Sequence, residues 1–282
     1  MDKQKRIVTV QDISCVGKCS CTAALPILSA CGIETVVLPT ALLSAHTDGF
    51  GENTFLDLTS EMKRISEHWK SIGLSFDCIY SGYLGSCEQT KFLLSFIDDF
   101  KKEGTLTVID PVMGDGGRLY KYFDHSFISD MRTLCKKADI ITPNLTEACM
   151  LANIPFCETY SEGHIGAIFS ALYALDAKNI VITGVKFDSD TIGYAYTDEN
   201  GGIGTIKEPF HRNVRFAGTG DVFASALVGM TMSGADFTQS VRLAAEFTEK
   251  CIDRTDDKTK DFYYGLSFEA CLGALTPNGS RE

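Results

Sequence analysis

The sequence predicts an α/β protein with a doubly wound, mainly parallel central sheet and helices on both faces. Short β-branched runs alternate with amphipathic segments of helix length along the 282 residues. Several of these runs stop at a proline or a glycine. No internal repeat, low-complexity segment or linker interrupts the alternation, so we expect residues 1–282 to form one domain.

The elements follow from residue type and from capping signals. Helices are expected over residues 54–69 and 86–100, and most of residues 218–271. Ser86 with Gln89, and Asp236 with Gln239, have the spacing of helix N-terminal caps. The segments 193–197 and 203–210 predict an antiparallel pair joined by DENGG. The other expected strands are IVTV (7–10), ETVVLPT (34–40), FDCIYS (76–81), TLTVIDPV (105–112), ADIITPN (138–144) and NIVITGV (179–185).

Composition narrows the class of partner. The net charge is −11, and such a surface repels nucleic acid and anionic membranes. The chain has no run of 18 apolar residues and no long apolar region after MDKQKR, so we expect a cytoplasmic protein. Its eleven cysteines are odd in number and spread along the chain, which favours reduced, mostly buried thiols.

Polar residues collect where the expected strands end. In doubly wound sheets, ligands bind beyond the carboxyl ends of the strands. A single Asp or Asn at such a position is often only a turn residue, but six positions together favour a site. They are Gln11 and Asp12, residues 44–47, residues 81–83, Asp110 with Asp115, Thr142 to Asn144 with Glu147, and Thr183 with Gly184.

The segment FAGTGDVFASALVGM is the most informative one. Gly218, Thr219 and Gly220 stand directly before an apolar helix, where glycines let backbone N–H groups turn toward one point. Such an anion hole suits the charge that develops on a transferred phosphoryl group. Asp221 in the first turn could take a proton from an attacking hydroxyl, or it could simply cap the helix. The chain has no GxxxxGK[ST] loop, no GxGxxG and no His-x-Glu or spaced CxxC zinc pair.

These residues carry a family resemblance. AGTGDVFASAL resembles the anion-hole signature of the ribokinase-like superfamily, which phosphorylates alcohol groups of small molecules with ATP. Within it the chain is most similar to the pyridoxal/pyridoxamine kinases of vitamin B6 salvage. The similarity follows the family's order through VQD, LSAHTDGFG, SGYLGSCEQ, VIDPVMGDGGRLY, DIITPNLTEACML and GTGDVFASAL.

The resemblance implies a role for each matching residue. Asp221 would be the base for the 5′-hydroxyl of a B6 vitamer, and residues 218–220 would form the anion hole. Asp110, Thr142 and Glu147 would organise Mg²⁺ and a monovalent cation (K⁺ or Na⁺) around ATP. Further contacts to ATP would come from Asp115, Asn144 and Thr183, and contacts to the vitamer from Asp12, Thr47, Tyr83 and Tyr120, with Tyr120 closing over the site. The family also implies a homodimer.

Two departures from the family pattern are visible. Many pyridoxal kinases have serine after the first-strand glutamine, whereas this chain has Asp12. A carboxylate there could accept from a protonated ring nitrogen or a vitamer amine, which leads to the hypothesis of a shifted vitamer preference. LSAHTDGFG also differs from the usual asparagine-histidine-threonine-glycine run.

Two other functions stay open at this point. A hydroxymethylpyrimidine kinase of thiamin synthesis would use the same scaffold on a similar aromatic alcohol. A non-enzymatic, thiol-rich metal-binding or ligand-sensing module is suggested by QDISCVGKCSCT. The C-x₃-C-x-C spacing of Cys15, Cys19 and Cys21 fits no common zinc or iron–sulfur site, however, and favours a tight loop beside a ligand. Lys18 is expected to be a solvated charge.

Overall fold

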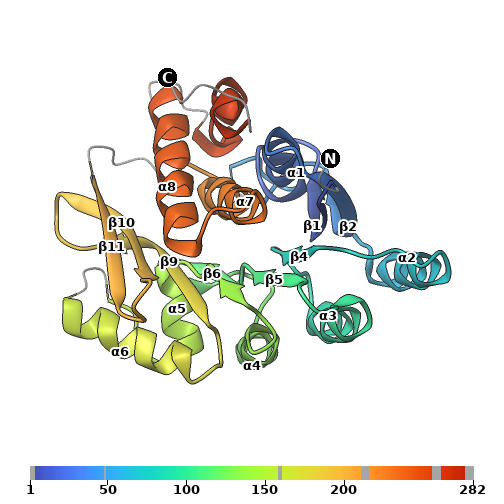
Figure 1. Cartoon of the computed structure of the whole chain (residues 1–282), viewed down its shortest axis with the longest axis horizontal. Helices are drawn as coiled ribbons and strands as arrows, with labels where there is room; N and C mark the ends of the chain where they lie inside the picture. Colours follow the sequence, from blue (N-terminus) through green and yellow to red (C-terminus); the bar gives the residue numbers. More distant parts are fainter. Residues whose placement is uncertain (1–3, 48, 158–160, 211–215, 256–261, 277–282) are drawn as a thin grey trace.

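The computed structural model describes residues 4–47, 49–157, 161–210, 216–255 and 262–276. Within them lies a nine-stranded sheet of order β11-β10-β9-β8-β5-β4-β1-β2-β3 (Figure 1). Neighbouring strands from β2 to β9 in this order pair in parallel. The pairs β2–β3, β9–β10 and β10–β11 are antiparallel. The strands are β1 (Arg6–Ser14), β2 (Glu34–Leu43), β3 (Phe55–Asp57), β4 (Cys78–Ser81), β5 (Leu106–Ile109), β8 (Ile140–Ile141), β9 (Asn179–Lys186), β10 (Thr191–Thr197) and β11 (Ile203–Pro209).

Helices cover both faces of this sheet, which confirms the predicted class (Figure 1). One face carries α1 (Ser20–Ala30), α7 (Thr219–Met232) and α8 (Phe237–Arg254), with the 3₁₀ turns η1 (Phe262–Tyr264) and η2 (Phe268–Leu275). The other carries α2 (Thr59–Ser71), α3 (Cys87–Phe100), α4 (His125–Cys135), α5 (Leu145–Ala152) and α6 (Glu162–Tyr173). A small hairpin joins β6 (Gly114–Asp115) to β7 (Arg118–Leu119). In the described residues, no helix has the length and apolar character needed to cross a membrane.

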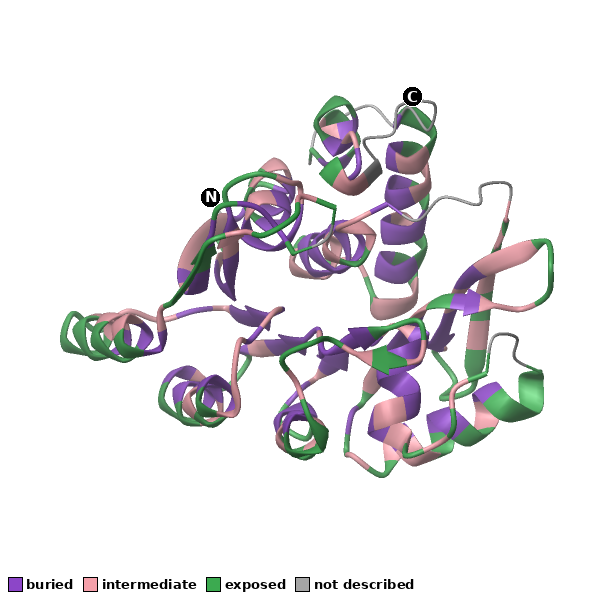
Figure 2. Ribbon diagram, turned by 180° about the vertical axis from the view of Figure 1, so that it is seen from behind, coloured by how far each residue is buried: buried purple, intermediate pink, exposed green. Residues whose placement is uncertain are grey.

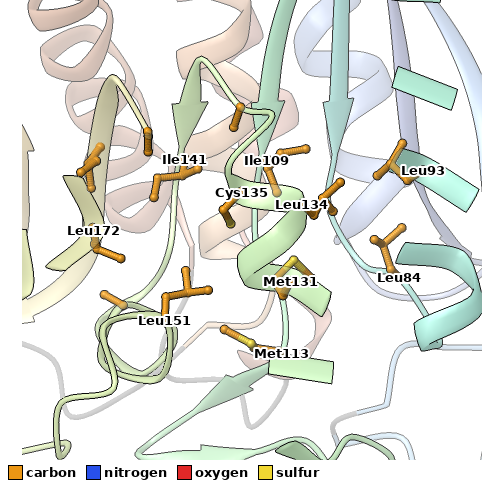
Figure 3. Close-up of a cluster of buried hydrophobic side chains, with 14 of the residues drawn as sticks. Leu84, Leu93, Ile109, Met113, Met131, Leu134, Cys135, Ile141, Leu151 and Leu172 are labelled. Carbon is orange, nitrogen blue, oxygen red and sulfur yellow. The ribbon is translucent and has the colours of Figure 1, made fainter. Parts of the chain in front are cut away.

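The sheet separates two apolar cores. Because successive side chains of a strand point to opposite faces, Ile7 of β1 joins the core under α1, α7 and α8, whereas Val8 joins the other core. The second core includes Ile109, Met131 and Leu134, which meet between the sheet and the helices (Figure 3). Figure 2 shows the central strands buried throughout. This burial on both faces is typical of parallel sheets.

The capping signals are confirmed, and one helix begins later than expected. Ser86 accepts from the N–H of Gln89 at 3.3 Å, and Asp236 accepts from that of Gln239 at 2.8 Å. The helix expected from residue 54 begins instead at Thr59. Residues 55–57 form β3, which pairs with the sheet edge at β2, and the Asp57 side chain accepts from the Thr59 N–H at 2.8 Å.

Two of the polar positions lie within strands rather than after them. β1 continues through Asp12 to Ser14, because its pairing with β2 resumes after an irregularity between Gln11 and Ile13. Thr183 and Gly184 lie inside β9, where the pairing with β10 shifts register and Gly184 takes a φ of 66°. Such a bulge redirects a strand without ending it.

Candidate active site

The carboxyl ends of the central parallel strands bring distant polar residues to one edge of the sheet. Hydrogen bonds of the parallel ladder continue past the strand ends, from Asp110 N–H to the Ser81 carbonyl at 2.9 Å and from Thr142 N–H to the Ile109 carbonyl at 3.1 Å. The Gly82 N–H donates to the Val10 carbonyl at 3.1 Å. The residues that follow β4, β5 and β8 therefore leave the sheet side by side, as the sequence predicted.

Asp221 occupies the first turn of α7, where the helix dipole favours a negative charge. Burial nevertheless raises the pKa of its carboxyl to about 7, and the nearby charge of Asp12 acts in the same direction. A backbone hydrogen bond from Ser20 opposes this rise. The loss of hydration therefore changes the pKa more than the hydrogen bond does. As a result, Asp221 can gain or lose a proton near neutral pH.

The start of α7 lies against the cysteine loop, residues 15–19. Gly218 has a φ of 70°, and a Cβ there would stand 2.1 Å from the Lys18 carbonyl oxygen. A Cβ at Gly220, by contrast, would meet nothing within 4 Å. The Thr219 hydroxyl donates to the Phe216 carbonyl at 2.9 Å, which fixes the turn. The N–H groups at the start of a helix lack intrahelical partners, so this turn has the composition of an anion site.

A first cluster of predicted residues surrounds Asp12. This side chain is 4% exposed and accepts from the Ser14 hydroxyl at 2.8 Å. Burial raises its pKa, while His46 and donors from Ser20 and Ser14 lower it. Tyr83 is half-buried, and its pKa is raised to about 12 by burial and by the charge of Asp12. The charge of Asp12 therefore reaches the Tyr83 hydroxyl.

Thr47 lies beside this cluster, in an exposed loop after β2. Its neighbour His46 is buried, at 8% exposure, and residue 48 lies outside the described residues. His46 belongs to the predicted polar stretch 44–47, but the sequence predicted no role for it. Its imidazole hydrogen-bonds the Tyr263 carbonyl and meets the Phe50 ring edge-on at 5.0 Å between centroids.

The C-terminal segment also holds the cysteine loop in place. The Lys18 N–H donates to the Tyr264 carbonyl at 2.9 Å, and the Lys18 ammonium pairs with Glu269 at 2.9 Å. Lys18 remains a partly exposed surface charge, as expected, and it is also paired with Glu269. The partner lies 251 residues away, and nothing in the local sequence indicates it.

A second cluster contains the buried carboxyls of Asp110 and Glu147. Burial, together with their mutual repulsion, raises the pKa of Asp110 well above its usual range. Burial raises the pKa of Glu147 to about 8, although it accepts from the N–H groups of Met113 at 3.0 Å and Asn144 at 2.8 Å. Two buried acids so close together would be stabilised by a positive charge.

The donor set of this cluster fits an oxygen-seeking cation. The buried Thr142 hydroxyl lies near Asp110 but makes no hydrogen bond of good geometry to the described residues. Among these residues, no three His, Cys, Asp or Glu side chains are arranged to hold a metal by themselves. Magnesium commonly uses one or two carboxylates and takes its other ligands from water and phosphates, so two acids and a free hydroxyl suffice.

The other predicted residues lie around the second cluster. Asn144 begins α5, and its amide accepts from the Glu147 N–H and donates to the Gly114 carbonyl at 2.8 Å. Asp115 is exposed on the β6–β7 hairpin, and the half-buried Thr183 donates its N–H to the Pro143 carbonyl at 3.0 Å. Tyr120 is 44% exposed, and the charges of Glu147, Asp115, Asp221 and Asp110 act with partial burial to raise the pKa of its hydroxyl.

In the described part of the chain, the cysteines of this segment do not form a group of three or more side chains that could hold a metal ion. Burial raises the pKa of the Cys19 and Cys21 thiols. Cys21 donates to the Gln11 carbonyl at 3.5 Å, and Cys15 is exposed. The loop packs between α7 and the C-terminal segment.

Comparisons with known proteins show which sequences and folds this chain resembles. The crystal structure of a "putative phosphomethylpyrimidine kinase" from Bacteroides thetaiotaomicron with pyridoxal has a TM-score of 0.92 and 35% identity, covering 97% of this chain and 96% of that one. Pyridoxal kinase from Lactobacillus plantarum has a TM-score of 0.86 and 31% identity, covering 97% of both chains. A putative pyridoxal kinase of Schizosaccharomyces pombe is 25% identical over 96% of this chain and 94% of its own length.

The family profile described as "Phosphomethylpyrimidine kinase" matches residues 21–263. The chain therefore belongs to this kinase family, within the ribokinase-like fold.

Proposed function

From this family membership, we propose that the protein transfers the γ-phosphoryl group of ATP to the 5′-hydroxyl of a vitamin B6 vitamer. Pyridoxal, pyridoxine and pyridoxamine share a pyridine ring that bears a hydroxymethyl group. The proposal is supported by relatives whose names and ligands concern pyridoxal, and by the electrostatic coupling of Asp221 to Asp12 and Asp110.

The placement of Asp221 is the observation that carries the proposal. Its charge acts on Asp110 of the acidic cluster, and the charge of Asp12 acts on it from the other side. Phosphoryl transfer needs an acceptor hydroxyl, a base and the nucleotide phosphates in line. Electrostatic influence of Asp221 on Asp110, and of Asp12 on Asp221, supports a base that lies near both the acidic cluster and the predicted acceptor contact.

On the acceptor side, Asp12, Thr47 and Tyr83 would contact the vitamer, and Asp221 would take the proton of its 5′-hydroxyl. Residues 218–220 would direct backbone N–H groups at the transferred phosphoryl group. The raised pKa of Asp221 suits this role, because a general base works best when its pKa lies near the working pH. No covalent phospho-enzyme is needed.

On the nucleotide side, Asp110, Thr142 and Glu147 would hold Mg²⁺, with Asp115, Asn144 and Thr183 placed toward ATP. Magnesium would neutralise charge on the phosphates when bound. The same residues would organise a monovalent cation, K⁺ or Na⁺. Because the Asn144 amide is already engaged in the α5 cap and with Gly114, its contact to a phosphate would use the remaining amide proton.

Hydroxymethylpyrimidine is the alternative acceptor. It is favoured by the family profile and by curated relatives that include hydroxymethylpyrimidine/phosphomethylpyrimidine kinases. Both acceptors are flat nitrogen heterocycles with a hydroxymethyl group, so the site geometry suits either. Asp12 is a buried carboxyl that can pair with a protonated ring nitrogen or an amine, and it therefore suits either acceptor.

The deciding experiment is an ATP-consumption assay with Mg²⁺ and each of four acceptors: pyridoxal, pyridoxine, pyridoxamine and hydroxymethylpyrimidine. Mass spectrometry of the products identifies the monophosphate. We expect the highest kcat/KM with a B6 vitamer. A protein purified in parallel as Asp221→Asn controls for kinases of the expression host. Turnover of hydroxymethylpyrimidine alone would select the alternative, and no turnover of any acceptor would refute both.

A further inference from the structure

His46 is a buried side chain in the loop that follows β2. It is 8% exposed, although Ser44 before it and Thr47 after it are both exposed. A buried imidazole is polar, and buried polar groups in folded proteins are almost always hydrogen-bonded. The contacts of His46 therefore show which parts of the molecule this loop joins.

The imidazole of His46 reaches the C-terminal segment. Its Nε2 bonds the carbonyl oxygen of Tyr263, 217 positions further along the chain. A carbonyl oxygen only accepts, so Nε2 carries the hydrogen of this bond. The Phe50 ring lies edge-on to both rings, with centroids 5.0 Å from His46 and 4.8 Å from Tyr263. One directional bond and two edge-to-face contacts thus hold the turn η1 against the loop after β2.

His46 also contacts the cysteine loop. Its backbone N–H donates to the Val16 carbonyl at 3.1 Å. Gly17 has a φ of 97°, and a Cβ there would stand 2.2 Å from the imidazole Cδ2, so the ring lies directly against the loop backbone. The Lys18 N–H donates to the Tyr264 carbonyl at 2.9 Å, which joins this loop to η1 as well. Three segments of the chain therefore meet around one side chain.

Two of these three segments lead to predicted acceptor contacts. Thr47 follows His46 directly, and Asp12 lies on β1 shortly before the cysteine loop. The two loops leave neighbouring strands together, since the Cys15 N–H donates to the Leu43 carbonyl at 2.9 Å. Asp221 is held separately, in the first turn of α7. A shift of the loops at His46 would therefore move Thr47 first and the proposed base least.

We propose that His46 is a positioning residue whose bond to the Tyr263 carbonyl makes the C-terminal turn η1 a support of the acceptor side. This inference rests on the proposed function. His46 acts through the two loops and not through contact with the reacting atoms. Loss of the bond should therefore weaken acceptor binding and leave the chemical step and ATP binding in place.

Two amide variants isolate the bond. The amide nitrogen of His46→Gln reaches as far as Nε2 and can donate to the Tyr263 carbonyl, whereas that of His46→Asn is one bond too short. Both variants lose the ring and its charge, so packing on Gly17 and the influence on the Asp12 pKa change equally. His68→Asn, at an exposed histidine of α2, is the control for the substitution itself and should match wild type.

We expect the acceptor KM of His46→Asn to exceed that of His46→Gln about three- to tenfold, the range for one lost hydrogen bond. The kcat and the KM of ATP should differ less than about twofold between them. Amide hydrogen exchange gives a second readout, independent of activity. Residues 15–19 and 262–264 should exchange at least about threefold faster in His46→Asn, because local opening becomes easier once the bond is lost.

Equal exchange in the two amide variants would show that the bond does not hold η1, and the positioning role would be wrong. Faster exchange in His46→Asn with equal acceptor KM values, in an active enzyme, would separate η1 from the acceptor side and also refute the role. A wild-type protein that phosphorylates none of the four acceptors would refute the proposed function, and the acceptor role of His46 with it. The exchange comparison would then still show whether His46 holds η1.

Discussion

Asn144 and Glu147 cap helix α5 reciprocally. The Glu147 N–H donates to the Asn144 side chain at 3.0 Å, and the Asn144 N–H donates to one Glu147 carboxyl oxygen at 2.8 Å. The other carboxyl oxygen accepts from Met113 at 3.0 Å. Glu147 therefore anchors the loop after β5 to the start of α5, while its charge contributes to the acidic cluster.

We expect Glu147→Gln to separate these two roles. The amide oxygen preserves one acceptor, but the amide NH₂ faces the second buried N–H donor, so the free energy of unfolding should fall by about 1–3 kcal/mol. The Mg²⁺ concentration for half-maximal activity should rise about tenfold or more, because a charged ligand is lost. A Mg²⁺ titration of activity with a parallel urea denaturation measures both.

Glu88→Gln is the matched control, since Glu88 lies in the first turn of neighbouring α3 and pairs with Lys63 at the surface. It should leave the Mg²⁺ dependence unchanged. An unaltered Mg²⁺ requirement in Glu147→Gln would remove Glu147 from the proposed cation site.

Asp221→Asn tests the base directly. Asparagine keeps the size of the side chain but cannot accept the proton of the acceptor hydroxyl. We expect kcat to fall about 10²- to 10⁴-fold, the usual contribution of a general base, with the acceptor KM changed little. Asp176→Asn is the control, because this exposed residue has a φ of 59° that asparagine also tolerates. A nearly active Asp221→Asn enzyme would contradict the proposed role of Asp221 as the general base.

The same variant tests the pH dependence of stability. The folded-state pKa of Asp221, about 7, lies above the ordinary value of an aspartate carboxyl, 3.8. Its stabilising contribution is therefore full below about pH 4 and is lost as pH rises through 7. Without nucleotide or Mg²⁺, Asp221→Asn should gain about 1–2 kcal/mol relative to wild type between pH 5 and pH 8, after allowing for partial exposure. Urea denaturation at the two pH values measures this difference, and a constant difference would contradict the raised pKa.

Tyr120→Phe tests which substrate Tyr120 serves. Its hydroxyl lies in the field of Glu147, Asp115 and two further carboxyls, so its removal should raise the KM of ATP about three- to tenfold and leave the acceptor KM unchanged. Tyr122→Phe is the comparison, because Tyr122 is 78% exposed. Steady-state kinetics, with ATP and the acceptor varied in turn, shows which of the two KM values changes. A change in the acceptor KM alone would support the predicted role of Tyr120, which is to close over the vitamer.

Local patterns predicted much of this structure. Alternating runs predicted the doubly wound sheet, and the ends of β4, β5 and β8 carry the polar residues as expected. Strand lengths were less predictable: β1 extends to Ser14 and β9 through Gly184, because pairing with neighbouring strands decides where a strand ends.

The contacts that surround the site could not be predicted from the sequence. The pairing of Lys18 with Glu269 and the bond from His46 to the Tyr263 carbonyl join residues more than 200 positions apart. Neither has a local signal. Ser20 is similar, since nothing in CSC indicates a left-handed backbone. Such contacts depend on how the C-terminal segment packs after the sheet has formed.

Gly218→Ala tests the contact between α7 and the cysteine loop. A Cβ there would stand 2.1 Å from the Lys18 carbonyl oxygen at a φ of 70°, so the loop and the helix start must separate. We expect the free energy of unfolding to fall by at least about 2 kcal/mol, and kcat to fall as well, because Asp221 moves with the helix start. Gly220→Ala, two residues on, has open space and an ordinary φ, so it should be neutral or stabilising by up to about 1 kcal/mol. Urea denaturation of the two variants gives the comparison, and equal stabilities would show that the loop yields to the added methyl group at no cost.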